Sequence, residues 1–211
     1  MSATISLGIY NSTHMKELIS KRKLDIGIIH ATILVLLQVL YAITYYVGIF
    51  SERQDAGKSI VYQVIFTYAY ISVLILIRRV LAKDKVLINN ILWIIRLEGI
   101  KAAGNILLIA GIYYAAVVVY LCSLVLSVFY ILSMIRIFNF RNAENMEFTK
   151  LGPILISLVI CFILVTLGSL YAVFDQVSGM YSVTNMIMAI PFIFLIKYFK
   201  SIKINQLQMD L

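Results

Sequence analysis

Three charged side chains, Arg96, Glu98 and Lys101, stand in a segment that is otherwise uncharged from Val86 to Ile135 and largely apolar. An ionisable group inside a bilayer is costly, and it usually pairs with another group or lines a path for an ion or substrate. A carboxylate beside a guanidinium and an ammonium could bind ions or polar molecules. This cluster is therefore the first candidate site.

Helical spacing divides the segment into two stripes. Glu98 and Lys101 are three residues apart, so they lie on one face and can neutralise each other in part. Arg96 lies on the neighbouring face and needs another partner. The first stripe comprises Asn90, Glu98, Lys101 and Asn105, and the second comprises Asn89, Trp93 and Arg96.

Three interpretations of the cluster remain open. In one, the helix is short and tilted, the charges reach the outer headgroups, and the stripe only holds helices together. In another, Glu98 and Arg96 line a solvated cavity or ligand site. In the third, the segment does not cross the membrane. With a rise of about 1.5 Å per residue, Arg96 and Glu98 would lie roughly 15–18 Å from Val86, near the midplane of a membrane.

Two other apolar segments also carry candidate residues, and these are amides and tyrosines. Gln38 and Tyr41 share a face with His30, and Gln63 shares one with Thr67 and Tyr70. An amide facing lipid without a partner costs several kcal/mol, so both glutamines should point between helices. They either make interhelical hydrogen bonds or line a substrate path. The candidate residues are Arg96, Glu98, Lys101, Gln38, Gln63, Tyr41 and Asn90.

Motifs for other chemistries are missing from the sequence. His14 and His30 are the two histidines, and no His-Glu-x-x-His pair occurs. Cys122 and Cys161 lie within apolar segments and form no CxxC pair. There is no Gly-x-Ser-x-Gly elbow and no Walker glycine loop. We therefore expect no catalytic residue, no metal and no cofactor.

Composition indicates which elements must position these residues. Of the 211 residues, 62% are hydrophobic and 13% charged, and the mean hydropathy is +0.96. Soluble domains are about 45–50% apolar and about 25% charged. Several apolar runs approach or exceed the roughly 20 residues that a spanning helix needs. The sequence therefore predicts an all-α integral membrane protein.

The distribution of Lys and Arg favours six spans over five. With five spans, Val86–Lys101 lies on the inner surface and the basic residues divide ten inside to eight outside. With six, Val86–Asn105 crosses outward, and fourteen are inside against Arg53 and Lys58 outside. The second distribution fits the positive-inside rule. We expect three helical hairpins, with both termini cytoplasmic and a tight turn near Ala103-Gly104-Asn105.

This topology gives one domain. Residues 1–25 form a cytoplasmic segment, and 198–211 form a cytoplasmic tail. The transmembrane domain covers residues 26–197, with spans at about 26–50, 59–77, 86–105, 106–135, 151–174 and 183–197. The protein is expected to be multi-pass in the cell membrane.

Three functions agree with this sequence. The first is a small-molecule or ion transporter, or the membrane subunit of one. The second is a non-transporting sensor, assembly or regulatory subunit. The third, an enzyme embedded in the membrane, lacks a recognisable acid–base or nucleophile set. The expected partners are the lipid bilayer and either another membrane subunit or a cytoplasmic ATPase. The net charge of +8 is explained by lipid contact, so no nucleic acid is expected.

Overall fold

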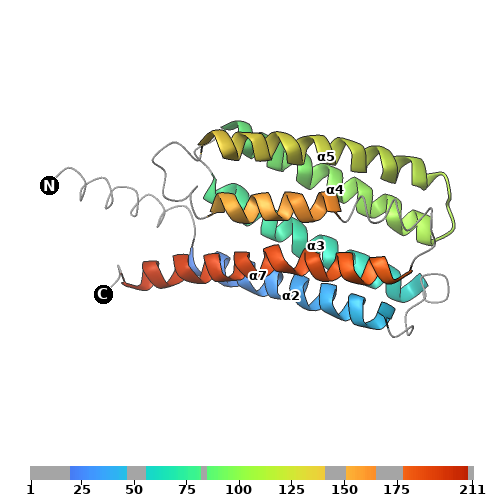
Figure 1. Ribbon diagram of the computed structural model, residues 1–211, viewed down its shortest axis with the longest axis horizontal. Coiled ribbons are helices and arrows are strands. Elements are labelled where there is room, and N and C mark those ends of the chain that lie inside the picture. Colours follow the sequence, from blue (N-terminus) through green and yellow to red (C-terminus); the bar gives the residue numbers. More distant parts are fainter. Residues whose placement is uncertain (1–19, 47–55, 82–84, 141–150, 165–177, 209–211) are drawn as a thin grey trace, which may run out of the picture.

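The structure is a computed structural model that describes residues 20–46, 56–81, 85–140, 151–164 and 178–208. This part of the chain contains six helices and no strand. Figure 1 shows them running side by side along the longest axis of the molecule. They are α2 (Lys21–Tyr46), α3 (Ala56–Val80), α4 (Lys85–Ile109), α5 (Ala115–Phe140), the helix Leu151–Leu164 and α7 (Ser178–Gln208).

Three of these helices are long and apolar enough to cross a membrane, namely Lys21–Thr44, Gly57–Val80 and Ala115–Ile137. Their mean hydropathies are 2.3, 2.1 and 2.5, yet no more than 33% of each apolar window is buried within the bundle. The remaining apolar surface agrees with a membrane environment, because exposing it to water would be unfavourable. The predicted all-α membrane class is thus supported.

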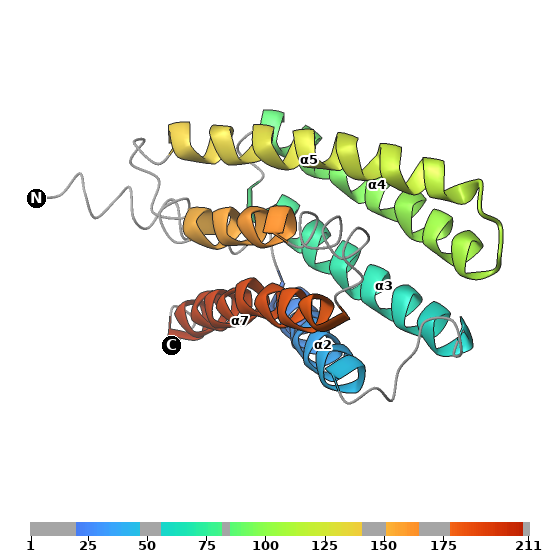
Figure 2. The ribbon, with the colours of Figure 1, turned by 45° about the vertical axis from the view of Figure 1, so that its right-hand side comes forward.

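Helix α4 is as long as its neighbours but is not among those three, because Arg96, Glu98 and Lys101 lie along it. It nevertheless packs against α3 on one side and α5 on the other. Figure 2 shows that α4 follows α5 over much of its length. The helix Leu151–Leu164 has 14 described residues and is apolar but short. Six crossings therefore remain a prediction.

The predicted turn at Ala103-Gly104-Asn105 is wrong, since these residues are helical and α4 continues to Ile109. The chain reverses at residues 110–114 instead. Gly111 has a φ of +91°, which is unstrained only for residues without a Cβ. The Gly111 amide donates to Leu108 O, and the Ile112 amide donates to Leu107 O. This pair of bonds is the Schellman arrangement that ends many helices.

Gly104 serves helix packing rather than the turn. A Cβ at this position would lie 2.8 Å from Val119 Cγ2 on α5, so the missing side chain lets the two helices approach closely. Sequence alone does not separate this use of glycine from its use in turns.

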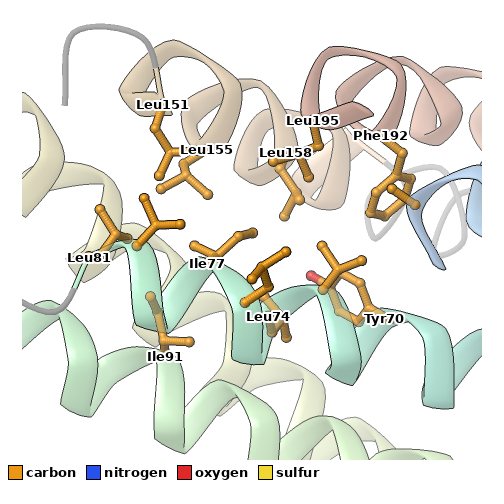
Figure 3. Packing of buried hydrophobic residues seen from close by; sticks show 14 of the residues in the cluster. Tyr70, Leu74, Ile77, Leu81, Ile91, Leu151, Leu155, Leu158, Phe192 and Leu195 are labelled. Atoms are coloured by element: carbon orange, nitrogen blue, oxygen red, sulfur yellow. The ribbon is translucent and has the colours of Figure 1, made fainter. Parts of the chain in front are cut away.

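The core is a continuous apolar cluster to which every described helix contributes. Figure 3 shows Leu151, Leu155 and Leu158 facing α3, where Leu74 and Ile77 lie. Helices α2 and α7 pack against each other, and Lys203 Nζ lies 2.5 Å from Asp25 Oδ1 near the ends of these two helices. Helix α7 continues to Gln208, so it includes much of the segment 198–211 that was predicted as a tail.

Candidate functional site

Glu98 lies on the buried face of α4, where side chains from three helices meet. The residue is 9% exposed, and the Tyr130 hydroxyl on α5 donates a hydrogen bond of 3.3 Å to Glu98 Oε1. The hydroxyl of Tyr70, on α3, hydrogen-bonds in turn to the hydroxyl of Tyr130. Both tyrosines are buried. We call these three residues the Glu98 centre.

The direction of the hydrogen bonds in this centre follows from counting protons. A tyrosine hydroxyl has one proton to donate. Because Tyr130 uses its proton on the carboxylate, Tyr70 must donate to Tyr130. The chain of donors therefore runs from Tyr70 through Tyr130 to Glu98. An ordered chain of this kind can stabilise a charge or carry a proton.

Lys101 lies one helical turn from Glu98, as the spacing predicted. Its Nζ is 4.0 Å from Glu98 Oε2, and its side chain is 23% exposed. The same ammonium lies 5.1 Å from the ring centroid of Phe162, a distance at which a cation is attracted to an aromatic face. Phe162 also packs on Tyr130, with centroids 4.5 Å apart. The helix Leu151–Leu164 thus closes the centre from a fourth side.

Arg96 is not part of this centre, although the sequence places it only two residues from Glu98. It is on the exposed side of α4, and its guanidinium lies 5.1 Å from the centroid of Trp93. Trp93 stacks on Phe129 of α5, with centroids 6.1 Å apart. Within the described ranges, no acidic side chain pairs with Arg96. Glu98, in the first predicted stripe, is therefore buried in the bundle, whereas Arg96, in the second, is exposed on its surface.

Gln38, Gln63 and Asn90, which were also predicted candidates, lie on α2, α3 and α4. Gln38 on α2 is 3% exposed, and its Oε1 has no hydrogen-bond partner in the described part of the chain. Gln63 is half-buried and donates to Thr67 on its own helix. Asn90 is buried two turns before Glu98. Gln38 therefore points between helices, as expected. Gln63 makes no hydrogen bond to another helix in the described part of the chain.

Tyr41 is connected to the centre through aromatic rings. It packs on Tyr62 at 4.7 Å between centroids, and Tyr62 is followed along α3 by Phe66 and then Tyr70 at spacings of 6.0 and 5.9 Å. Tyr70 contacts Phe192 of α7 edge-on at 6.0 Å. This aromatic row joins α2, α3 and α7.

Tyr130 and Phe162 were not predicted from the sequence, and Tyr70 was predicted only as part of a polar face. Tyr130 is 32 positions from Glu98 in the chain, so no local spacing relates the two. A tyrosine in an apolar helix also has an ordinary explanation as an interface anchor. The depth of Tyr130 within α5 was the one signal against that explanation.

Among the described residues, no group of three or more His, Cys, Asp and Glu side chains is placed to hold a metal. His30 hydrogen-bonds through Nδ1 to Ser72 Oγ at 2.6 Å. Cys122 and Cys161 are buried free thiols.

No protein-family model matches the chain, and no curated protein or solved structure shows significant similarity to it.

Proposed function

We propose that this protein moves a small solute or an ion across the cell membrane, either alone or as the membrane subunit of a larger transporter. Glu98 is its ionisable binding group. The observation that carries the proposal is the burial of this carboxylate among four helices, with a two-tyrosine chain of donors directed at it. Such a group can take up and release a proton or a cation.

The position of Glu98 along α4 supports this role. Glu98 is thirteen positions after Lys85, where α4 begins, which corresponds to about 20 Å of helix. If α4 crosses the membrane between α3 and α5, the carboxylate is near the midplane. Transporter sites typically occur at this depth.

The charge environment of Glu98 also favours function over structural support. Its ion pair with Lys101 is long, at 4.0 Å, so the carboxylate is only partly neutralised. Buried ion pairs are often no more stabilising than apolar side chains of similar volume. A purely structural role would be met equally well by packed leucines.

The test is proton flux into vesicles that contain the purified protein and a trapped pH-sensitive dye, driven by a potassium gradient with valinomycin. Wild-type protein should exceed protein-free vesicles. Glu98→Gln should reduce the flux at least about tenfold, because a tenfold loss needs only about 1.4 kcal/mol. Arg96→Gln, on the exposed side of the same helix, is the matched control and should keep the flux.

Equal flux in wild type and Glu98→Gln would contradict the assignment of Glu98. Wild-type flux no faster than that of protein-free vesicles would contradict transport by the chain alone. A transporter that depends on a cytoplasmic ATPase would then require that partner in the vesicles.

One observation favours a second function, that of a non-transporting assembly or regulatory subunit. Arg96 and Trp93 lie on the exposed side of α4, where a guanidinium facing lipid is costly. A partner helix carrying a carboxylate at the same depth would satisfy it. Under this function, Arg96→Gln abolishes activity in cells and Glu98→Gln does not, which is the reverse of the expectation for transport.

A further inference from the structure

Helix α7 has a proline, Pro191, in its interior. Proline has no amide proton, so Pro191 cannot bond to the carbonyl four residues earlier, which is that of Ile187. Its ring also crowds this carbonyl, and prolines within helices are the usual positions of bends. The backbone of α7 therefore lacks one of its regular hydrogen bonds between Ile187 and Pro191.

The carbonyl that Pro191 leaves without its regular donor accepts a hydrogen bond from another helix. Cys161 Sγ, on the helix Leu151–Leu164, donates to Ile187 O at 3.7 Å. Figure 1 and Figure 2 both show this helix beside α7. A carbonyl without a partner is costly inside a membrane, and neighbouring helices commonly satisfy those that a proline frees. Cys161 thus meets a need that Pro191 creates.

This bond is weak, and the part of α7 that follows it is well anchored. A thiol is a weak donor, so its bond to a carbonyl costs less to break than the amide bond it replaces. Beyond the proline, Leu195 and Phe199 are fully buried, and Lys203 pairs with Asp25 of α2. An easily broken bond beside an anchored segment is suited to a hinge.

The residues that follow the proline and the cysteine both pack against the Glu98 centre. Phe192, directly after the proline, contacts the Tyr70 ring edge-on at 6.0 Å between centroids. Figure 3 shows the Phe192 side chain directed toward α3, on which Tyr70 lies. Phe162, directly after the cysteine, packs on Tyr130 at 4.5 Å between centroids. A bend in α7 would therefore change the packing around the two tyrosines of the centre.

We propose that Pro191 is a hinge in α7 and that the Cys161 thiol is a latch that holds it, so that release of the latch moves Phe192 against Tyr70. Cys161 and Pro191 are then positioning residues, because they act on Glu98 through the tyrosines. The use of the hinge in moving a solute rests on the proposed transport function, whereas the hinge and its latch do not.

Infrared spectroscopy of the full-length protein in lipid vesicles tests the latch. The S–H stretching band lies apart from other protein bands, and its frequency falls when the thiol donates a hydrogen bond. Cys122→Ala leaves Cys161 as the one thiol of the chain. Adding Pro191→Ala supplies an amide proton for Ile187 O and should raise the Cys161 frequency. An unchanged frequency would show that the thiol does not replace the bond that proline removes.

The second native thiol provides the control for this measurement. Cys161→Ala leaves Cys122 as the one thiol, and its band should keep the same frequency when Pro191→Ala is added. An equal rise at both thiols would mean that Pro191→Ala disturbs the whole bundle, and would overturn a specific latch at Cys161.

Hydrogen–deuterium exchange followed by mass spectrometry tests the hinge. Cys161→Ala should speed exchange in peptides covering residues 187–195 at least about twofold, because loss of one weak hydrogen bond changes a local opening equilibrium by about this factor. Cys161→Ser keeps a donor and should exchange like wild type. Cys122→Ala, which removes the other buried thiol, is the matched control.

The dependence on proline separates a latch from ordinary packing. In the Pro191→Ala background, Cys161→Ala should not change the exchange rate, since the amide of the new residue then bonds to Ile187 O. An equal effect in both backgrounds would overturn the latch. If Cys161→Ala does not fold, the infrared comparison of Cys122→Ala with and without Pro191→Ala still decides the matter.

The link to the Glu98 centre has a readout of its own, which also separates this proposal from transport. The Tyr70 Cζ signal in solid-state NMR, assigned by its loss in Tyr70→Phe, should shift in Cys161→Ala and stay in place in Cys122→Ala. A shifted signal without proton flux into vesicles would contradict the proposed function and leave the hinge intact. Flux dependent on Glu98, with an unshifted Tyr70 signal, would contradict the link from hinge to centre alone.

Discussion

At the scale of single residues, the hydrogen bonds to Glu98 decide how its charge is stabilised. One oxygen accepts a bond from Tyr130, and the other faces an ammonium 4.0 Å away. Hydrogen bonds inside membrane proteins contribute about 0.6 kcal/mol on average, whereas bonds to a charged group contribute about 1.5–3 kcal/mol. The Glu98 centre should fall in the upper range if the carboxylate is ionised.

A double-mutant cycle measures this bond. Tyr130→Phe should lower the free energy of unfolding by about 1–2 kcal/mol when Glu98 is present, and by clearly less in the Glu98→Gln variant. Reversible unfolding of the purified protein by sodium dodecyl sulfate in mixed micelles gives the four free energies. Tyr120→Phe, at an exposed position of the same helix, is the control and should have no effect. Additive effects of the two substitutions would show that the bond contributes nothing.

The residues of the candidate site were predictable from sequence only where the signal was local. Glu98 and Lys101 were found because charges are rare in an apolar segment and because three-residue spacing places them on one face. Helical spacing also separated Arg96 and Trp93 from them, and the contact between these two side chains agrees with it. Tyr130 escaped because its relation to Glu98 exists only after α4 and α5 pack together.

At the scale of helices, one glycine allows α4 to approach α5 closely. Gly104 faces Val119 across this interface, whereas Gly99 on the same helix has open space where a Cβ would be. The two positions share secondary structure but differ in what surrounds them. They therefore form a matched pair for testing the packing.

Substituting these glycines should have opposite effects. Gly104→Ala should destabilise the protein by about 1–3 kcal/mol, because the new methyl group must displace Val119. Gly99→Ala should stabilise it by up to about 1 kcal/mol through helix propensity alone. Unfolding free energies in mixed micelles provide the comparison. If Gly104→Ala were as stable as Gly99→Ala, the close approach of the two helices would be wrong.

Helices themselves were largely predictable, and their ends were not. Apolar length indicated the helices containing Gln38, Gln63 and Tyr120, because each is too long and too apolar for an aqueous fold. The reversal between α4 and α5 was misplaced because Gly104-Asn105 has turn composition, whereas the actual turn contains Ile112, Tyr113 and Tyr114 around Gly111. Amino-acid composition predicts neither the helix packing at Gly104 nor the left-handed φ at Gly111.

At the scale of the whole molecule, composition indicates the class, and the asymmetry of the basic residues predicts the orientation. The three apolar helices α2, α3 and α5 agree with a membrane protein. The packing of α4 between α3 and α5 favours its crossing beside them despite its charges. If α4 crosses, the turn at residues 110–114 is outside and the Glu98 centre lies within the membrane. If Val86–Lys101 lies on the inner surface, both statements fail.

The most direct measurement is therefore the accessibility of this turn. Tyr113 and Tyr114 are 79% and 89% exposed, so Tyr113→Cys places a thiol there without disturbing the core. Cys122 and Cys161, the native cysteines, are first replaced by alanine. Arg79→Cys, at the opposite end of the bundle, is the control. A membrane-impermeant maleimide added outside intact cells should label Tyr113→Cys, and should label Arg79→Cys only after permeabilisation. A Tyr113→Cys variant that stays unlabelled in intact cells would contradict the crossing of α4 and with it the membrane position of Glu98.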